Sequence, residues 1–333
     1  MSYLYVNENG VTIGIEANRC IAKYPDGMKK YVPIEALEGI VIMGKSQLTT
    51  QCLEECLIRG INVSYFSKGG KYFGRVQSTG HIKAERQRKQ CALYNTEFAL
   101  ELAKEIISAK IKNQLVVLRR YERFRKLSLA DIHDKMIICR NKIDECKSVS
   151  EIMGYEGQSA KYYFDGLSKC INKEFEFHGR TRRPPLDEFN SMIGLGYSIL
   201  MNELYGKIEE KGLNPYFGFM HRDAENHPTL ASDLMEEWRA VIVDATVMSI
   251  INGNEIEKSD FTHDLDEPGC YLTKNGVGIL LKKLEKKFET DVRYLDYVSY
   301  PVNFRHAIQL QINQLVKAIE SEDAQVYHPI IIR

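Results

Sequence analysis

The sequence contains no long hydrophobic run, and we do not expect a signal peptide from its first residues. No apolar stretch among its 333 residues approaches the roughly 20 residues that a membrane-spanning helix needs. The first residues, Met1 to Glu8, lack the basic region followed by an apolar region that marks a signal peptide. We therefore expect a cytoplasmic protein with no membrane partner.

Net charge and clustered cysteines are also missing. Lys and Arg total 45 and Asp and Glu total 45, so the formal net charge is zero. Binding to a nucleic acid must then depend on local basic patches, because phosphate neutralisation supplies most of the non-specific affinity. The eight cysteines are scattered and include no Cys-x-x-Cys pair. This spacing favours reduced, packed thiols over disulfides or a zinc site.

The first eighty residues have the pattern of β structure. Short alternating apolar runs are separated by glycine-containing turns. Asn9-Gly10 predicts a hairpin joining residues 3–6 to 11–15, and Asp26-Gly27 predicts another joining residues 19–24 to 29–32. Further strands are expected at 39–43, 60–66 and 72–76, and one helix at 49–59.

Helical periodicity replaces this pattern from about His81 onward. Helices are expected at residues 83–125, 131–146, 159–173, 187–211, 230–252, 274–290 and 300–321. The predicted fold class is therefore α+β with two domains. A small N-terminal β-sheet domain with one helix, residues 1–80, precedes a larger all-α catalytic domain, residues 81–333. Basic clusters at 83–89 and 110–126 are equally compatible with solvated helix faces.

A histidine and two carboxylates are close together in the segment that begins at Asn214. His221 ends an apolar, glycine-containing run, and Asp233 and Glu236 follow after a polar loop. The two acids are three residues apart, so they share one face of a helix, which we expect to point away from the packed stripe. One imidazole with one or two carboxylates suits Mg²⁺ or Mn²⁺ better than zinc. Glu237 is expected to be solvated or in a helix salt bridge. Surface groups that complement the helix macrodipole have the same pattern.

Two further motifs lie upstream of this segment. Glu156 stands between glycines in a segment rich in small and aromatic residues. An arginine-rich turn, Arg180 to Pro185, leads to Asn190 and Gly196-Tyr197. This turn is short and is stiffened by two prolines, which favours contact with phosphates over a solvated face.

In this order, the motifs resemble those of the CRISPR-associated integrases, metal-dependent endonucleases that insert new spacers into CRISPR arrays. The shared pattern is a glycine-flanked Glu, Arg-Arg-Pro-Pro leading to Asn and Gly-Tyr, Gly-x-x-His, and Asp-Leu-x-Glu with Arg239 three residues on. The motifs cover about residues 150 to 252. Trp238 stands where Phe is usual and Ala240 where Pro is common, and neither belongs to the metal set.

The resemblance implies a site and a reaction. Glu156, His221 and Glu236 are expected to bind Mg²⁺ or Mn²⁺, with Asp233 either a further ligand or a residue that orients one. The reaction would be phosphodiester transesterification by the 3′-hydroxyl of a short DNA duplex, or cleavage when water attacks. The expected DNA-contact residues are Lys161, Arg180, Arg182, Arg183, Asn190 and Tyr197.

The resemblance also implies partners and a role in CRISPR adaptation, a form of antiviral defence. The substrates would be double-stranded and branched DNA, namely a prespacer and a CRISPR repeat. We expect a homodimer formed mainly through residues 1–80, with two such dimers flanking a small, nuclease-like adaptation partner protein.

Two other classes of protein remain compatible with parts of the sequence. One is a catalytically inactive DNA-binding scaffold of the same fold, against which the intact Glu, His and Glu set argues. The other is an unrelated carboxylate hydrolase, such as a glycoside hydrolase that uses Glu156 and Glu236 as acid and base. That alternative leaves His221 and the Arg-Pro-Pro turn unexplained.

Overall fold

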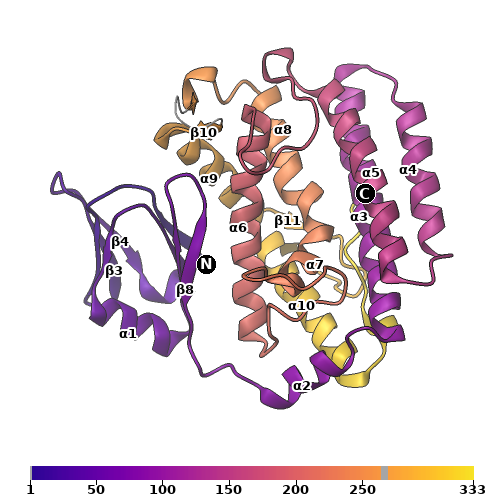
Figure 1. Ribbon diagram of the computed structural model, residues 1–333. Coiled ribbons are helices and arrows are strands. Elements are labelled where there is room, and N and C mark those ends of the chain that lie inside the picture. Colours follow the sequence, from indigo (N-terminus) through magenta and orange to yellow (C-terminus); the bar gives the residue numbers. More distant parts are fainter. Residues whose placement is uncertain (1, 264–268) are drawn as a thin grey trace.

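The computed structural model describes residues 2–263 and 269–333 and confirms the predicted fold class, with strands first and helices after them (Figure 1). The elements of the strand-rich part are β1 (Ser2–Val6), β2 (Thr12–Glu16), β3 (Arg19–Lys23), β4 (Lys29–Pro33), β5 (Leu37–Met43), β6 (Gln47–Leu48), α1 (Thr50–Arg59), β7 (Asn62–Phe66) and β8 (Tyr72–Val76). They form two four-stranded sheets, in the orders β1-β5-β7-β8 and β4-β3-β2-β6.

One of the two predicted hairpins is confirmed and the other is wrong. Strands β3 and β4 pair antiparallel around Asp26-Gly27 as expected. Strand β1 instead pairs parallel with β5, while β2 pairs with β3. Gly10 has a φ of 76° and its N–H donates to the carbonyl of Lys45 at 2.7 Å. The Asn-Gly turn therefore carries the chain from one sheet into the other.

Helix α1 forms where the sequence predicts it, because both of its ends are capped. The Thr49 side chain accepts the N–H of Cys52 at 3.3 Å, and Gly60 ends the helix in the left-handed region with a φ of 71°. The helix covers a small core that it shares with both sheets, including Ile13 and Ile40.

The helical part begins after β8. Its elements are α2 (Ala84–Ala92), α3 (Glu97–Arg125), α4 (Ala130–Ile143), α5 (Val149–Cys170), α6 (Glu188–Glu210), α7 (Thr229–Trp238), the π-helical segment η3 (Arg239–Asp244), α8 (Ala245–Asn252), β9 (Phe261–His263), β10 (Cys270–Leu272), α9 (Lys274–Phe288), β11 (Asp291–Val292), β12 (Val302–Asn303) and α10 (Phe304–Ser321). Among the described residues, no helix is long and apolar enough to span a bilayer.

Three features of this part differ from the expectation. The predicted helix 83–125 is broken between α2 and α3, where Asn95 has a φ of 58°. Helix α5 begins ten residues before the predicted start at Ser159, so Glu156 lies within the helix and not ahead of it. The pairs β9–β10 and β11–β12 add two small antiparallel sheets to a domain expected to be all-α.

The two parts of the chain share a core. Tyr3 and Phe66, from the sheet β1-β5-β7-β8, belong to the same buried cluster as the helical residues. Arg305 of α10 pairs with Glu203 of α6 at 3.0 Å and with Glu285 of α9 at 2.8 Å, and its guanidinium lies 4.7 Å from the ring centre of Tyr3. Helix α6 stands between the sheets and helices α3, α4 and α5 (Figure 1).

Candidate active site

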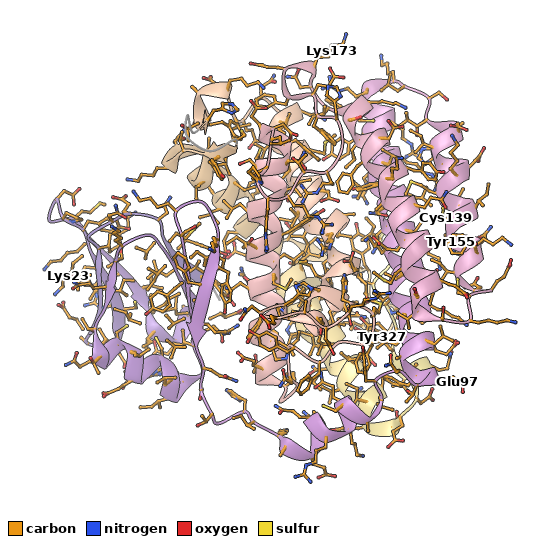
Figure 2. The ribbon with its side chains drawn as sticks, viewed as in Figure 1. Lys23, Glu97, Cys139, Tyr155, Lys173 and Tyr327 are labelled. Atoms are coloured by element: carbon orange, nitrogen blue, oxygen red, sulfur yellow. The ribbon has the colours of Figure 1, made fainter. Side chains whose placement is uncertain are left out.

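Helices α3, α5 and α7 bring two of the predicted ligands to one point. Glu156 of α5 and Glu236 of α7 both contact the ammonium of Lys110 on α3, which lies 2.5 Å from Oε2 of Glu236. Tyr155, the neighbour of Glu156, is labelled on α5 in Figure 2. Burial lowers the pKa of Lys110, but the charges of Glu236 and Glu156 outweigh this effect and raise it.

Sequence reasoning missed Lys110. It belongs to a basic cluster that was equally compatible with a solvated helix face, yet the residue is only 5% exposed. A signal was present in its spacing. Lys110 lies three and four residues after Ile107 and Ile106, on the stripe that α3 buries.

Asp233 holds the backbone that leads into His221. Its Oδ2 accepts the N–H groups of Phe219 at 2.6 Å and Met220 at 3.0 Å, and its Oδ1 accepts the N–H of His221 at 3.0 Å. A side chain at Gly218 would come within 2.6 Å of Asp233 Oδ2, so this close approach requires glycine. The carboxylate is 1% exposed.

Asp233 also orients the imidazole of His221. Its Oδ1 lies 2.6 Å from Nδ1, which leaves Nε2 facing Glu236, 3.7 Å from Oε1. Burial lowers the pKa of His221, but the hydrogen bond and charge of Asp233 outweigh it, so the pKa is raised. Because its oxygens are engaged in this way, the orienting role that the sequence left open for Asp233 is favoured over that of a further ligand.

Glu236 is a desolvated carboxylate among positive charges. Burial raises its pKa, but Arg239, Lys110 and His221 together lower it to about 2, so the group is ionised. Arg239 Nε lies 3.1 Å from Oε1. Oε2 is buried and has no hydrogen bond of good geometry, although Lys110 is close. This position therefore favours a cation, and Lys110 supplies one at 2.5 Å from Oε2.

The three predicted ligands are not close enough together to bind one metal ion in this conformation. Within residues 2–263 and 269–333, the ligand atoms of Glu156, His221 and Glu236 are not grouped within 4.8 Å of one another. Both carboxylates instead contact the Lys110 ammonium. A divalent cation held by all three residues requires this ammonium to withdraw.

A layer of aromatic and charged groups continues the site. Two guanidinium groups lie over the Tyr197 ring, that of Arg239 at 4.6 Å from the ring centre and that of Arg180 at 5.4 Å. Its hydroxyl donates to Asp244 at 2.6 Å, and burial raises the pKa of Asp244 to about 6. Residues 229–252 are helical throughout, which confirms the helix predicted for 230–252, and Arg239 to Asp244 form a π-helical turn, η3, within it. Such turns are frequent at functional sites.

The arginine-rich turn is held by Asn190. The buried Asn190 Oδ1 accepts the N–H of Thr181 at 3.1 Å and a guanidinium N–H of Arg180. Its Nδ2 donates to the carbonyl of Gly179 at 2.9 Å and to Asp187 at 2.6 Å. The expected DNA contact by Asn190 stays a prediction, and the structure shows its amide bonded within the turn. The exposed basic residues near it are Arg182, Arg183 and, on α5, Lys161.

Helix α7 is buried on all sides, contrary to the expectation of an outward acidic face. Glu237, expected to be solvated or in a salt bridge, accepts the Tyr327 hydroxyl and the N–H of Ile330, the latter at 2.8 Å. Burial raises the pKa of Glu237 to about 8. Figure 2 shows Tyr327 within the helical part.

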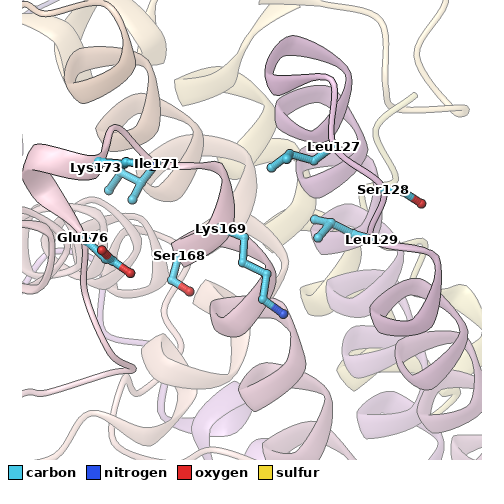
Figure 3. A pocket seen from close by; sticks show the side chains of 8 residues that line it. All are labelled: Leu127, Ser128, Leu129, Ser168, Lys169, Ile171, Lys173 and Glu176. Atoms are coloured by element: carbon cyan, nitrogen blue, oxygen red, sulfur yellow. The ribbon is translucent and has the colours of Figure 1, made fainter.

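A surface pocket lies away from these residues. It has a volume of about 330 Å³ and is lined by residues that include Leu129, Ser168, Lys169 and Ile171 (Figure 3). Ser168 is twelve residues beyond Glu156 on α5, a separation of about 18 Å along the helix. The pocket contains none of the predicted ligands.

Fold and site together define a class of protein: a two-part α+β chain with a Glu-His-Glu site beside an arginine-rich turn. The chain matches the family model described as CRISPR associated protein Cas1 over residues 4–286, and it belongs to that family. A protein of Mycobacterium tuberculosis strain H37Rv named CRISPR-associated endonuclease Cas1 is 34% identical over 327 residues, which cover 96% of this chain and 95% of that protein.

Two solved structures share the fold. A CAS1 protein from Thermotoga maritima has a TM-score of 0.82 and 25% identity, and the match covers 96% of this chain and 97% of the other. A casposase bound to an integration product has a TM-score of 0.86 and 25% identity, covering 100% of this chain and 96% of the other.

Proposed function

We propose that this chain is a metal-dependent DNA endonuclease and integrase that inserts new spacers into a CRISPR array. The observation that carries the proposal is the convergence of the Glu156 and Glu236 carboxylates on one buried point, with Nε2 of His221 beside it. Two likenesses support it. A similar curated protein is named an endonuclease, and a protein of similar structure, a casposase, is described as bound to an integration product.

Mg²⁺ or Mn²⁺ is the cofactor that this donor set fits. Two carboxylates and one imidazole are hard and borderline ligands, and no thiol is among them. The buried Oε2 of Glu236 is paired with the Lys110 ammonium at 2.5 Å, and a bound ion would take the place of that charge. Bound by Glu156, His221 and Glu236, the ion would stabilise charge on the phosphate oxygens and activate the attacking hydroxyl or water.

The protein residues divide the remaining work. Asp233 keeps the Nδ1 side of His221 occupied, so that Nε2 stays free for coordination. Arg239 and the displaced Lys110 place positive charge next to a phosphate that enters the site. In the reaction, the 3′-hydroxyl oxygen forms a new bond to phosphorus and the bond from phosphorus to the departing 3′-oxygen breaks. One phosphodiester thus replaces another, and attack by water gives cleavage.

The DNA would lie along the exposed Lys161, Arg182 and Arg183, with Arg180 and Tyr197 behind them. The proposed substrates are double-stranded and branched DNA, as prespacer and CRISPR repeat. The proposed assembly is a homodimer joined through residues 1–80 that works with a small adaptation partner protein in the cytoplasm.

Strand transfer of a short DNA duplex into a plasmid carrying a repeat tests the proposal. Glu156→Gln, His221→Ala and Glu236→Gln should each lower the Mn²⁺-dependent rate by at least about 100-fold, because losing even an outer-sphere partner of a metal ligand costs about 10–100-fold. Circular dichroism should show that the variants stay folded. Glu151→Gln, on the exposed side of the same helix α5, is the matched control and should retain activity.

Wild-type rates from any one of the three variants would sink the ligand assignment. If the wild-type chain binds branched DNA but neither joins nor cuts it, the inactive scaffold is the better description. Hydrolysis that persists without divalent metal would instead favour a carboxylate acid and base pair.

A further inference from the structure

A second group of metal-binding side chains lies outside the candidate active site. Glu188, His263 and Cys270 each offer one ligand atom, and these atoms all lie within 4.8 Å of one another. Across residues 2–263 and 269–333, this is the one group of three or more His, Cys, Asp or Glu side chains that meets so closely. None of its members belongs to the motifs that suggested the Mg²⁺ or Mn²⁺ site.

The backbone places these three side chains together. Strands β9 and β10 pair antiparallel with Cys270 directly opposite His263, so both side chains project from the same face of the hairpin. Glu188 is in the first turn of α6, directly after the cap residue Asp187. The N–H of Cys270 donates to the carbonyl of Pro185 at 2.8 Å and fixes the hairpin against the turn that precedes α6.

The chemistry of the group differs from that of the active site. A thiolate, an imidazole and a carboxylate suit zinc and related transition metals, whereas Mg²⁺ and Mn²⁺ prefer oxygen ligands. Cys270 and Glu188 are buried, and His263 is exposed, which gives a route from solvent. Without metal, Lys258 balances Glu188 at 2.7 Å.

Electrostatics favour a cation at this position. The carboxylates of Glu188 and Asp187 act on Cys270 electrostatically, and Lys258 offsets part of their charge. The same negative charges attract a divalent ion. Its binding would displace the thiol proton to solvent, as is usual for cysteine sites.

We propose that Glu188, His263 and Cys270 bind a transition metal of the zinc class and fasten the β9–β10 hairpin to the start of α6. The site is structural, and it is separate from the catalytic ion. Because Cys270 also holds Pro185, the metal would brace the turn that presents Arg182 and Arg183.

Cobalt binding tests this proposal directly, since a cysteine thiolate bound to Co²⁺ gives a near-ultraviolet charge-transfer band. The full-length chain, purified without a histidine tag and stripped of metal, should develop the band with one equivalent of Co²⁺. Cys270→Ser should abolish it, and His263→Ala should weaken Co²⁺ binding by at least about 10-fold. Glu156→Gln should keep the band, because the active site offers no thiol.

Cys91 provides the matched control, because it is an exposed cysteine of the described chain. Cys91→Ser should leave the band unchanged. A band that disappears with Cys91→Ser and persists with Cys270→Ser would show adventitious binding and overturn the proposal, as would a wild-type chain with no band at saturating Co²⁺. If Cys270→Ser does not fold, His263→Ala, a change at an exposed residue, tests the site instead. A Co²⁺ affinity equal to that of the wild type would count against the site. A Zn²⁺-induced rise in melting temperature equal to that of the wild type would do the same.

Discussion

Lys110 carries the positive charge that balances Glu156 and Glu236 when no divalent cation is bound. All three side chains are largely buried, so water solvates neither carboxylate well. Removing the ammonium leaves two buried anions facing each other. The Lys110 ammonium and a divalent cation therefore compete for the same two carboxylates. A cation that binds both of them must displace the ammonium.

Lys110→Met should lower the melting temperature of the metal-free chain and enlarge the rise that Mn²⁺ produces. Breaking a buried ion pair from one side costs about 3–5 kcal/mol, and the cation replaces the missing charge. Thermal melts in EDTA and in Mn²⁺ measure both effects. Lys112→Met, two residues further along α3, is the control. A Mn²⁺-induced rise equal to that of the wild type would contradict the competition.

Arg182 and Arg183 are exposed on the turn that Asn190 organises, which suits contact with phosphates. Replacing both with Ala should weaken binding to duplex DNA irrespective of sequence. The slope of log K against log salt should become shallower by about 0.9 per lost contact. Lys282→Ala with Lys286→Ala, two exposed charges on α9, is the matched control. An unchanged slope in the arginine variant would mean that these residues do not touch the DNA backbone.

For single residues, the sequence predicts which side chains have the chemistry of a site, but it does not predict which of them are buried. Its motifs single out Glu156, His221 and Glu236, and the structure brings these toward one another around Lys110. It does not reveal Lys110 as their partner, because burial of a helical lysine depends on which helices pack against it. The same limit applies to Glu237, whose partners lie about ninety residues away.

Among the elements, the C-terminal segment braces the helix that carries Glu236. The neighbouring Glu237 accepts from Tyr327 and Ile330. Asn113 of α3 donates to the carbonyl of Ile330 at 3.0 Å and accepts the N–H of Ile332 at 2.9 Å. Residues 327–332 are thus bonded to both α3 and α7, the helices that supply Lys110 and Glu236.

Tyr327→Phe should destabilise the fold by about 1–3 kcal/mol, the cost of leaving a buried acceptor without its donor. Urea denaturation followed by circular dichroism measures this difference. Tyr300→Phe serves as the control, because Tyr300 is 57% exposed. Equal stability of the two variants would show that the Tyr327 hydroxyl contributes little to this brace.

Element boundaries were predictable where local caps set them. Thr49 and Asp187 each accept a backbone N–H at a helix start, and both helices begin where the sequence predicts, within one residue. The failures have non-local causes. Strand β1 finds its partner β5 more than thirty residues away, and nothing local in the Asn9-Gly10 turn reveals this.

In the whole molecule, the strand-rich part and the helical part share one core. The predicted role of residues 1–80 in dimer formation therefore cannot be tested by removing them. Tyr3 and Phe66 pack with the helical core, and Arg305 joins α10 to both α6 and α9 beneath Tyr3. Deleting the strand-rich part would expose this apolar face and disturb the helices. Point substitutions on the outer surface of residues 1–80 can change dimer formation without disturbing the fold. A truncated chain that begins at His81 would change both.

We predict a homodimer formed through residues 1–80. Strands β4 and β8 are edge strands, and they carry the exposed Tyr31 and Phe73, which are 44% and 66% accessible. Exposed edges need cover, and a two-fold axis supplies it by pairing one surface with its own copy. A chain with both Tyr31→Lys and Phe73→Lys should therefore sediment as a monomer while keeping a melting temperature close to that of the wild type.

Phe124→Lys on α3 is the matched control, because Phe124 is 64% exposed and lies on the helical part. This variant should remain dimeric, since it places one of the same aromatic-to-lysine changes at a site outside the predicted interface. Sedimentation velocity at several concentrations separates the two outcomes. If the double variant stays dimeric while Phe124→Lys dissociates, the helical part makes the interface. The two active sites of the dimer would then be joined through the domain that carries the chemistry, and the strand-rich part would cover only its own core.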